Sequence, residues 1–167
     1  SENIALADKK LYALRDVTAT VDNLSLISSS IMSKKIAAGS DVIVLDVKTG
    51  SGAFMKDIES ARLLAEKMVE IGKGAGRRIA ALITDMNVPL GYYVGNSLEI
   101  IEAVETLKGN GPEDLTGISV FLAAKLLQLA GYGSFEECQT LAKSKIDDGS
   151  ALRKLAEMVT LQGGHSE

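Results

Sequence analysis

Residues 41–85 have the sequence DVIVLDVKTGSGAFMKDIESARLLAEKMVEIGKGAGRRIAALITD, and this stretch decides the fold. Residues 42–45 form a short β-branched run, which is typical of a strand buried on both faces. From Asp57 onward, apolar residues recur at helical spacing, at Ala61, Leu64, Ala65, Met68 and Ile71. The glycines of residues 72–76 end that helix, and residues 79–83 form a second buried strand. This order predicts a βαβ unit with parallel strands, whose functional edge lies at the carboxyl ends of the strands.

Helices are predicted on both sides of this unit. Residues 1–15 have the composition of a polar lead-in, whereas residues 24–38 carry apolar residues at helical spacing without a Gly or Pro. In the second half, stretches that contain glycine separate three or four further helices. Asn96 and Ser134 each stand three positions before an acid, as helix-capping residues do. The sequence therefore predicts an α/β fold with a parallel βαβ core and flanking helices.

Composition limits the classes of function. The 167 residues are 46% hydrophobic, which suits one compact domain. The net charge is −4 with both signs mixed along the chain, so neither a nucleic acid nor a membrane is expected as a partner. Cys138 is the only cysteine and His165 the only histidine, so a Cys/His metal cluster is not expected. A lone cysteine and a polar N-terminus without a secretory signal predict a cytoplasmic location.

Two short motifs contain residue types that can bind a ligand. Residues 48–52, KTGSG, stand between a strand and a helix, where a glycine-rich loop can bind phosphate. Their spacing matches neither common phosphate-loop pattern, so a structural turn is the favoured interpretation. Ser30 and Lys34 are four positions apart, which places a hydroxyl and an ammonium on one helix face. On residue type alone, a solvated helix edge with a snorkelling lysine is the default interpretation of this pair.

Longer strings carry a more specific signal. They are ADKKLYALRDVTATVD at residues 7–22, SSSIMSKKIAAGSDVIVLDVKTGSGAFMK at residues 28–56 and LITDMNVPLGYYVGNSLEIIEAVETLKGNGPEDL at residues 82–115. These strings resemble pyrimidine-nucleoside and thymidine phosphorylases, and the similarity runs from about residue 7 to residue 164. The resemblance is closer to the members with broad pyrimidine specificity than to the strict thymidine enzymes.

The resemblance implies a set of substrate-binding residues. Arg15, Ser30 and Lys34 match the ligands of the pyrimidine base in this family, while Tyr12 and Ile27 match residues that line the same pocket. In the reaction, phosphate attacks the anomeric carbon of the sugar and the base leaves with negative charge on its carbonyls. Cationic donors at those oxygens stabilise the transition state more than the substrate, so Arg15 and Lys34 are also the expected catalytic residues.

A cation site is implied as well. The resemblance places Leu90, Tyr93 and Glu102 where the family holds a monovalent cation, through two backbone carbonyls and one carboxylate. A structural potassium ion is therefore expected in the full-length enzyme, and no other cofactor.

The same resemblance implies how the chain is organised. Residues 1–40 match a helical segment of the family's small α domain, and residues 41–167 match part of its large α/β domain. The family's phosphate loop has no counterpart here, so the chain is expected to be an internal fragment that is inactive by itself. Pyrimidine nucleoside and phosphate are the expected substrates, and a homodimer is the expected state of the full-length enzyme.

Two alternatives remain open. Anthranilate phosphoribosyltransferases share the architecture, but their diphosphate-binding motifs are not found, and YALRDVTATV at residues 12–21 favours the nucleoside enzymes. A stable domain without catalytic activity would keep the fold and lose turnover.

Overall fold

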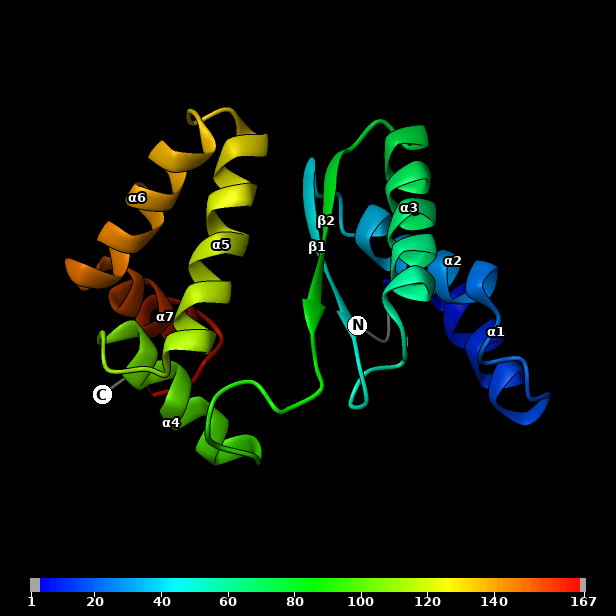
Figure 1. Cartoon of the computed structure of the whole chain (residues 1–167), viewed down its shortest axis with the longest axis horizontal. Helices are drawn as coiled ribbons and strands as arrows, with labels where there is room; N and C mark the ends of the chain where they lie inside the picture. The colour runs from blue at the N-terminus through cyan, green and yellow to red at the C-terminus, as the bar shows by residue number, and fades with distance from the viewer. Residues whose placement is uncertain (1–3, 166–167) are drawn as a thin grey trace. The chain divides into compact units, whose positions relative to one another are not determined.

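A computed structural model describes residues 4–165 of the chain (Figure 1). Contacts divide the chain into two units, Ser1–Val88 and Pro89–Glu167. The sequence predicts a domain boundary after residue 40 instead, but that boundary refers to the architecture of a full-length relative and stays a prediction. None of the described helices is both long and apolar enough to span a lipid bilayer.

The predicted βαβ unit is confirmed in the first of these units. Strand β1 (Val42–Thr49) pairs in parallel with β2 (Arg78–Asp85), and helix α3 (Ile58–Gly74) connects them. Helix α3 begins where expected because the Asp57 side chain accepts a hydrogen bond from the Ser60 amide at 2.7 Å. Both strands are longer than their apolar runs, since the parallel pairing continues to Thr49 and Asp85.

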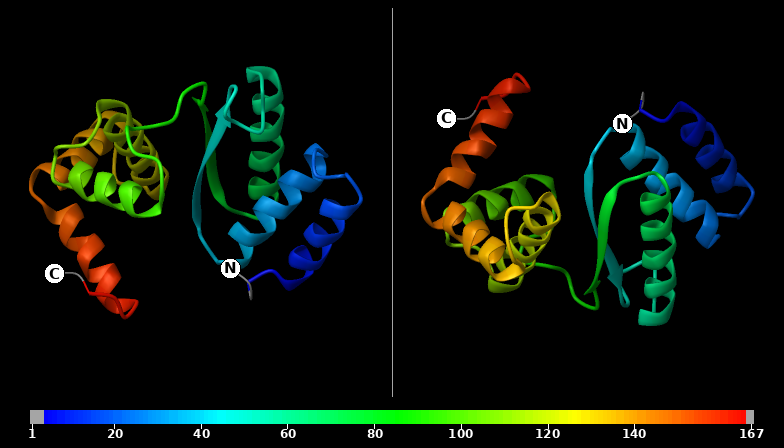
Figure 2. Two further views of the ribbon diagram at one scale, coloured as in Figure 1. Left: turned by 90° about the horizontal axis from the view of Figure 1, so that it is seen from below. Right: turned by 90° about the horizontal axis from the view of Figure 1, so that it is seen from above.

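One face of this sheet carries the core. Alternate residues of β1 point into this core, namely Ile43, Leu45 and Val47. They pack with α3 and with Met32, which is fully buried. Burial of β1 on both faces, as the sequence predicts, is not observed in the described residues, because Val44 is only half-buried and Asp46 is exposed. Figures 1 and 2 show α3 along that one face, with α2 beside it.

Two helices precede the sheet. Helix α1 (Leu6–Val17) occupies most of the stretch that the sequence predicts as a polar lead-in, so that prediction is wrong. Helix α2 (Leu24–Ala37) matches its predicted range, and Asn23 caps it by accepting from the Leu26 amide at 3.1 Å. Helix α1 packs on α2, and α2 packs on α3. The packing of α1 on α2 explains why a mainly polar segment is helical, because tertiary contacts stabilise helices that propensity alone does not.

The second unit is helical, as predicted. It contains α4 (Asn96–Leu107), α5 (Glu113–Ala130), α6 (Phe135–Asp147) and α7 (Ser150–Leu161). Ser134 forms the predicted capping box with Glu137. The cap predicted at Asn96 is wrong, because Gly95 takes the N-cap position and its amide donates to Glu99 Oε1 at 3.0 Å.

Candidate functional site

One face of α1 carries three polar or aromatic side chains toward α2. Asp8, Tyr12 and Arg15 are spaced four and three positions apart, so they lie one above another on the helix. The guanidinium of Arg15 lies 4.9 Å from the centre of the Tyr12 ring, which is a cation–π distance. Arg15 is only 6% exposed, whereas Tyr12 remains about half-exposed.

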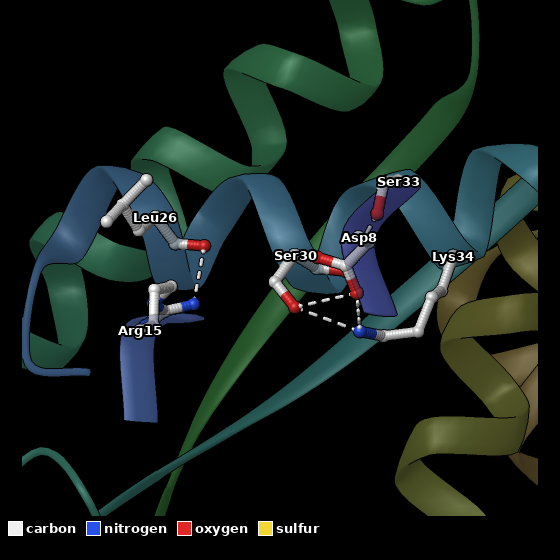
Figure 3. A network of polar contacts seen from close by, with 6 residues as sticks. All are labelled: Asp8, Arg15, Leu26, Ser30, Ser33 and Lys34. Atoms are coloured by element: carbon white, nitrogen blue, oxygen red, sulfur yellow. Dashed lines mark hydrogen bonds and ion pairs between the residues drawn. The ribbon is translucent and has the colours of Figure 1, made fainter. Parts of the chain in front are cut away.

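The Arg15 side chain holds the connection between α1 and α2. Its nitrogens donate to the carbonyl oxygens of Thr20 at 3.4 Å, Val21 at 2.5 Å and Leu26 at 3.1 Å. Figure 3 shows the last of these bonds on α2. Backbone carbonyls that lose contact with water need such donors. Arg15 therefore has a structural role in fixing this connection, beyond the ligand role that the resemblance implies.

Ser30 and Lys34 lie on the same face of α2, as their spacing predicts. Lys34 Nζ donates to Ser30 Oγ at 2.9 Å, and both groups donate to Asp8 Oδ2, from Lys34 at 2.6 Å and from Ser30 at 3.1 Å (Figure 3). The three side chains form a closed triangle that ties α1 to α2. Ser30 is buried, while the side chain of Lys34 is 41% exposed.

Asp8 is the functional candidate that sequence reasoning missed. Burial raises the pKa of its carboxyl, but the hydrogen bonds from Lys34 and Ser30 and the nearby positive charges outweigh that effect, so the pKa lies below its ordinary value. Because the folded pKa is lowered, the contribution of Asp8 to stability is present at neutral pH and is lost as the pH falls through that lowered value. One signal for it was available, since Asp8 stands seven positions, or two turns, before Arg15.

A cavity of about 290 Å³ lies beside these residues. Four of the five predicted substrate-binding residues line it, namely Tyr12, Arg15, Ile27 and Ser30. Lys34 does not line the cavity, but it forms a hydrogen bond with Ser30, which does line it. The rest of the wall was not predicted and is mainly apolar; it comprises Val21, Ile31, Asp46, Val47, Lys48, Phe54, Met55, Leu64 and Met68. Apolar walls with a few convergent polar groups are typical of small-molecule sites.

The glycine-rich loop after β1 uses its amides within the protein. Gly50 donates to the Met55 carbonyl at 3.0 Å, and Gly52 donates to the Met86 carbonyl at 2.9 Å. The Ser51 amide donates to Asn87 Oδ1 at 3.1 Å. These amides are therefore not directed at a ligand, which supports the structural interpretation of the motif.

Lys48, the first residue of that motif, is also engaged. Its ammonium lies 2.6 Å from Asp46 Oδ2 and 3.0 Å from Thr84 Oγ1, and the second contact joins β1 to β2. The charge of Lys48 at the cavity is thus balanced by its neighbour Asp46.

The predicted cation ligands lie in the second unit. Glu102, on α4, is 6% exposed, and its Oε1 accepts hydrogen bonds from the amides of Tyr92 at 2.8 Å and Tyr93 at 3.2 Å. The preceding loop residue, Gly91, has a φ of +72°, and a Cβ atom there would lie 2.2 Å from Glu102 Oε2. The carboxylate therefore organises the loop that includes Leu90 and Tyr93.

This arrangement is compatible with a cation. A buried carboxylate is stable when a positive charge or several donors face it. In the part of the chain that the structure describes, no lysine or arginine forms an ion pair with Glu102, and its hydrogen-bond donors are the two backbone amides. A monovalent ion beside the carboxylate would balance its charge, with loop carbonyls as neutral ligands.

The contact between Gly91 and Glu102 gives a first testable prediction. We expect Gly91→Ala to destabilise the protein by about 1–2 kcal/mol through its left-handed backbone, and by roughly 1–3 kcal/mol more because the added Cβ displaces the Glu102 carboxylate. Gly109→Ala is the matched control, since Gly109 has a φ of +87° and nothing within 4 Å of its Cβ position. Urea denaturation midpoints measure both effects, and equal losses in the two variants would show that Glu102 does not depend on the open space at Gly91.

The α/β fold agrees with the comparisons to known proteins. Residues 1–152 match the family described as glycosyl transferase family, a/b domain. The chain belongs to this family. It is 54% identical over 165 residues to a pyrimidine-nucleoside phosphorylase of Geobacillus stearothermophilus, and 55% identical over 165 residues to pyrimidine-nucleoside phosphorylases of Staphylococcus aureus strains bovine RF122 / ET3-1 and USA300. Each match covers 98% of this chain and 38% of the relative.

Proposed function

We propose that the protein is a pyrimidine-nucleoside phosphorylase, which transfers the pentose of a pyrimidine nucleoside to phosphate and releases the free base with pentose 1-phosphate. The observation that carries the proposal is the cavity beside α1 and α2, lined by Tyr12, Arg15, Ile27 and Ser30. The relatives with 54–55% identity bear the name of this activity. The chain spans 38% of their length, so the proposed activity is that of the whole protein and not of this chain alone.

The chemistry of the site fits a leaving pyrimidine. The bond between the base and the sugar breaks while a phosphate oxygen bonds to the anomeric carbon, and the electron pair of the broken bond stays on the base. Negative charge then spreads over the ring carbonyls, where hydrogen-bond donors lower the barrier. Arg15 makes three bonds to backbone carbonyls with its five N–H groups, which leaves donors for a base carbonyl. Lys34 adds a second positive charge next to Ser30.

The cation site belongs to the same proposal. We infer that Glu102 and the carbonyls of Leu90 and Tyr93 bind a monovalent ion such as potassium in the whole protein. The buried carboxylate of Glu102 supports this assignment, because its hydrogen-bond donors within residues 4–165 are neutral amides. Such an ion would order the loop before α4 and would not take part in the bond changes.

We further propose that the protein works in the cytoplasm as a homodimer that contacts its partner through the small α domain, of which residues 1–40 are a segment. Helix α1 supports this proposal because large apolar side chains on it are more than half exposed, at Leu6, Leu11, Leu14 and Val17. Exposed apolar surface of this kind marks interaction sites. Analytical ultracentrifugation tests the state of association, and a monomer at micromolar concentration would contradict it.

The activity has a direct test. We expect the protein as its natural gene encodes it to release uracil from uridine only when phosphate is present, with pentose 1-phosphate as the second product. The 167-residue chain alone is expected to show no turnover, because the family's phosphate loop has no counterpart in it and the amides of its own glycine-rich loop are bonded internally. Chromatography of the products measures both results. Release of base without phosphate, or transfer to anthranilate from a ribose diphosphate donor, would contradict the assignment.

A further inference from the structure

We propose that Asp8 is a positioning residue that sets the direction of the Ser30 hydroxyl, and that it thereby makes the site prefer pyrimidines with a ring N–H between two carbonyls. This inference rests on the proposed function, since it concerns the base that the cavity binds. Uracil and thymine carry such an N–H group, whereas cytosine carries a bare ring nitrogen at the same place. The interactions of the Asp8, Ser30 and Lys34 side chains give the reason.

The protons in the triangle can be assigned from the chemistry of the three groups. An ammonium only donates, and an ionised carboxylate only accepts. Lys34 Nζ lies 2.9 Å from Ser30 Oγ, so the serine oxygen must be the acceptor of that bond. The hydroxyl of Ser30 then has one proton to give, and Asp8 Oδ2 at 3.1 Å is the acceptor that faces it.

This assignment leaves Ser30 Oγ with an acceptor and no donor for a ligand. Its proton is directed to Asp8 and one lone pair accepts from Lys34, so the second lone pair remains. Ser30 also lines the cavity. A ring N–H can donate to that lone pair. The bare nitrogen of cytosine would face it with a lone pair of its own, and this mismatch discriminates between the bases because neither group supplies a proton.

Without the carboxylate, the direction of the hydroxyl is no longer fixed. In Asp8→Asn the side chain keeps its size, but the amide can present either an oxygen or an N–H to Ser30. When the amide donates, the serine proton is free to turn toward the cavity and to bond with a bare ring nitrogen. The variant should therefore lose affinity for uracil and gain relative affinity for cytosine.

A purely structural role for Asp8 makes a different prediction. Asp8 also ties α1 to α2 through Lys34, so its loss could loosen the site as a whole. Looser packing would weaken uracil and cytosine binding by the same factor. The ratio of the two affinities therefore separates the roles, while a change in stability does not.

The experiment uses calorimetric binding of uracil and cytosine to the protein as its natural gene encodes it, together with the kinetics of uridine phosphorolysis. We expect Asp8→Asn to lower the uracil-to-cytosine affinity ratio by about tenfold, the size of one mispaired hydrogen bond. Asp16→Asn is the matched control, since Asp16 is an exposed acid on the same helix and should leave the ratio within about twofold. Equal weakening of both bases in Asp8→Asn, or an unchanged ratio, would overturn the inference.

Ser30→Ala is a second variant, and it tests the inference even if Asp8→Asn does not fold. It removes the acceptor itself, so the affinity ratio should fall at least as far as in Asp8→Asn. Adding Asp8→Asn to Ser30→Ala should change the ratio no further, because the two residues act through one bond. A ratio that Ser30→Ala leaves unchanged would overturn the inference. Absence of phosphate-dependent turnover in the unsubstituted protein would instead contradict the proposed function.

Discussion

Replacing Lys34 by alanine is expected to lower kcat/KM for uridine phosphorolysis by roughly 30- to 1,000-fold, which corresponds to about 2–4 kcal/mol of transition-state stabilisation. Lys34 supplies a positive charge 2.9 Å from the Ser30 hydroxyl, next to the cavity where the base is proposed to develop negative charge. An effect on the transition state should appear mainly in kcat, whereas a loss of simple binding would raise KM. Steady-state kinetics with uridine and phosphate measures the two parameters separately.

Lys35 provides the matched control for this prediction. It has the same charge on the same helix, but it lies roughly 100° further around the axis and is exposed. Lys35→Ala should change kcat/KM by less than about threefold, in keeping with a surface substitution. If Lys35→Ala were as damaging as Lys34→Ala, the loss would reflect the general charge of α2 and not the position of Lys34 beside Ser30.

The fold could be predicted from sequence where hydrophobic periodicity was strong. The βαβ unit was predictable because the spacing from Ala61 to Ile71 and the β-branched runs each match one kind of element. Helix α1 was missed because its sequence is mainly polar, and the contact with α2 that stabilises it joins segments that no local pattern connects.

The site was only partly predictable for a related reason. The spacing of Ser30 and Lys34 indicated a shared helix face, and in the structure the Lys34 ammonium donates a hydrogen bond to the Ser30 hydroxyl. The spacing of Ser30 and Lys34 cannot show which acid from another helix completes the pair, and the position of Asp8 two turns before Arg15 is a weak signal, so Asp8 was not among the predicted residues. The cap at Asn96 failed similarly, because a glycine with a φ of +124° before it could take the N-cap position and let Glu99 bond back to the chain.

Arg15 was predicted as a ligand, and its contacts add a role that its sequence position did not indicate. A guanidinium presents its donors as a rigid fork, which suits several carbonyls around one turn. The three carbonyls that it bonds belong to the connection between α1 and α2 and to α2 itself. Arg15 should therefore affect the stability of the protein as well as the proposed binding of the base.

Arg15→Ala is accordingly expected to lower the free energy of unfolding by about 2–4 kcal/mol, because hydrogen bonds from a charged donor contribute roughly 1.5–3 kcal/mol each and rehydration of the freed carbonyls recovers part of that sum. Arg15→Lys keeps the charge but offers a single point of donation, so it should restore less than half of the loss. Arg62→Ala is the control, since Arg62 is exposed on α3 and should shift the urea midpoint little. A denaturation midpoint unchanged in Arg15→Ala, together with a large fall in kcat/KM, would show that the carbonyl bonds contribute little and that Arg15 acts on the base alone.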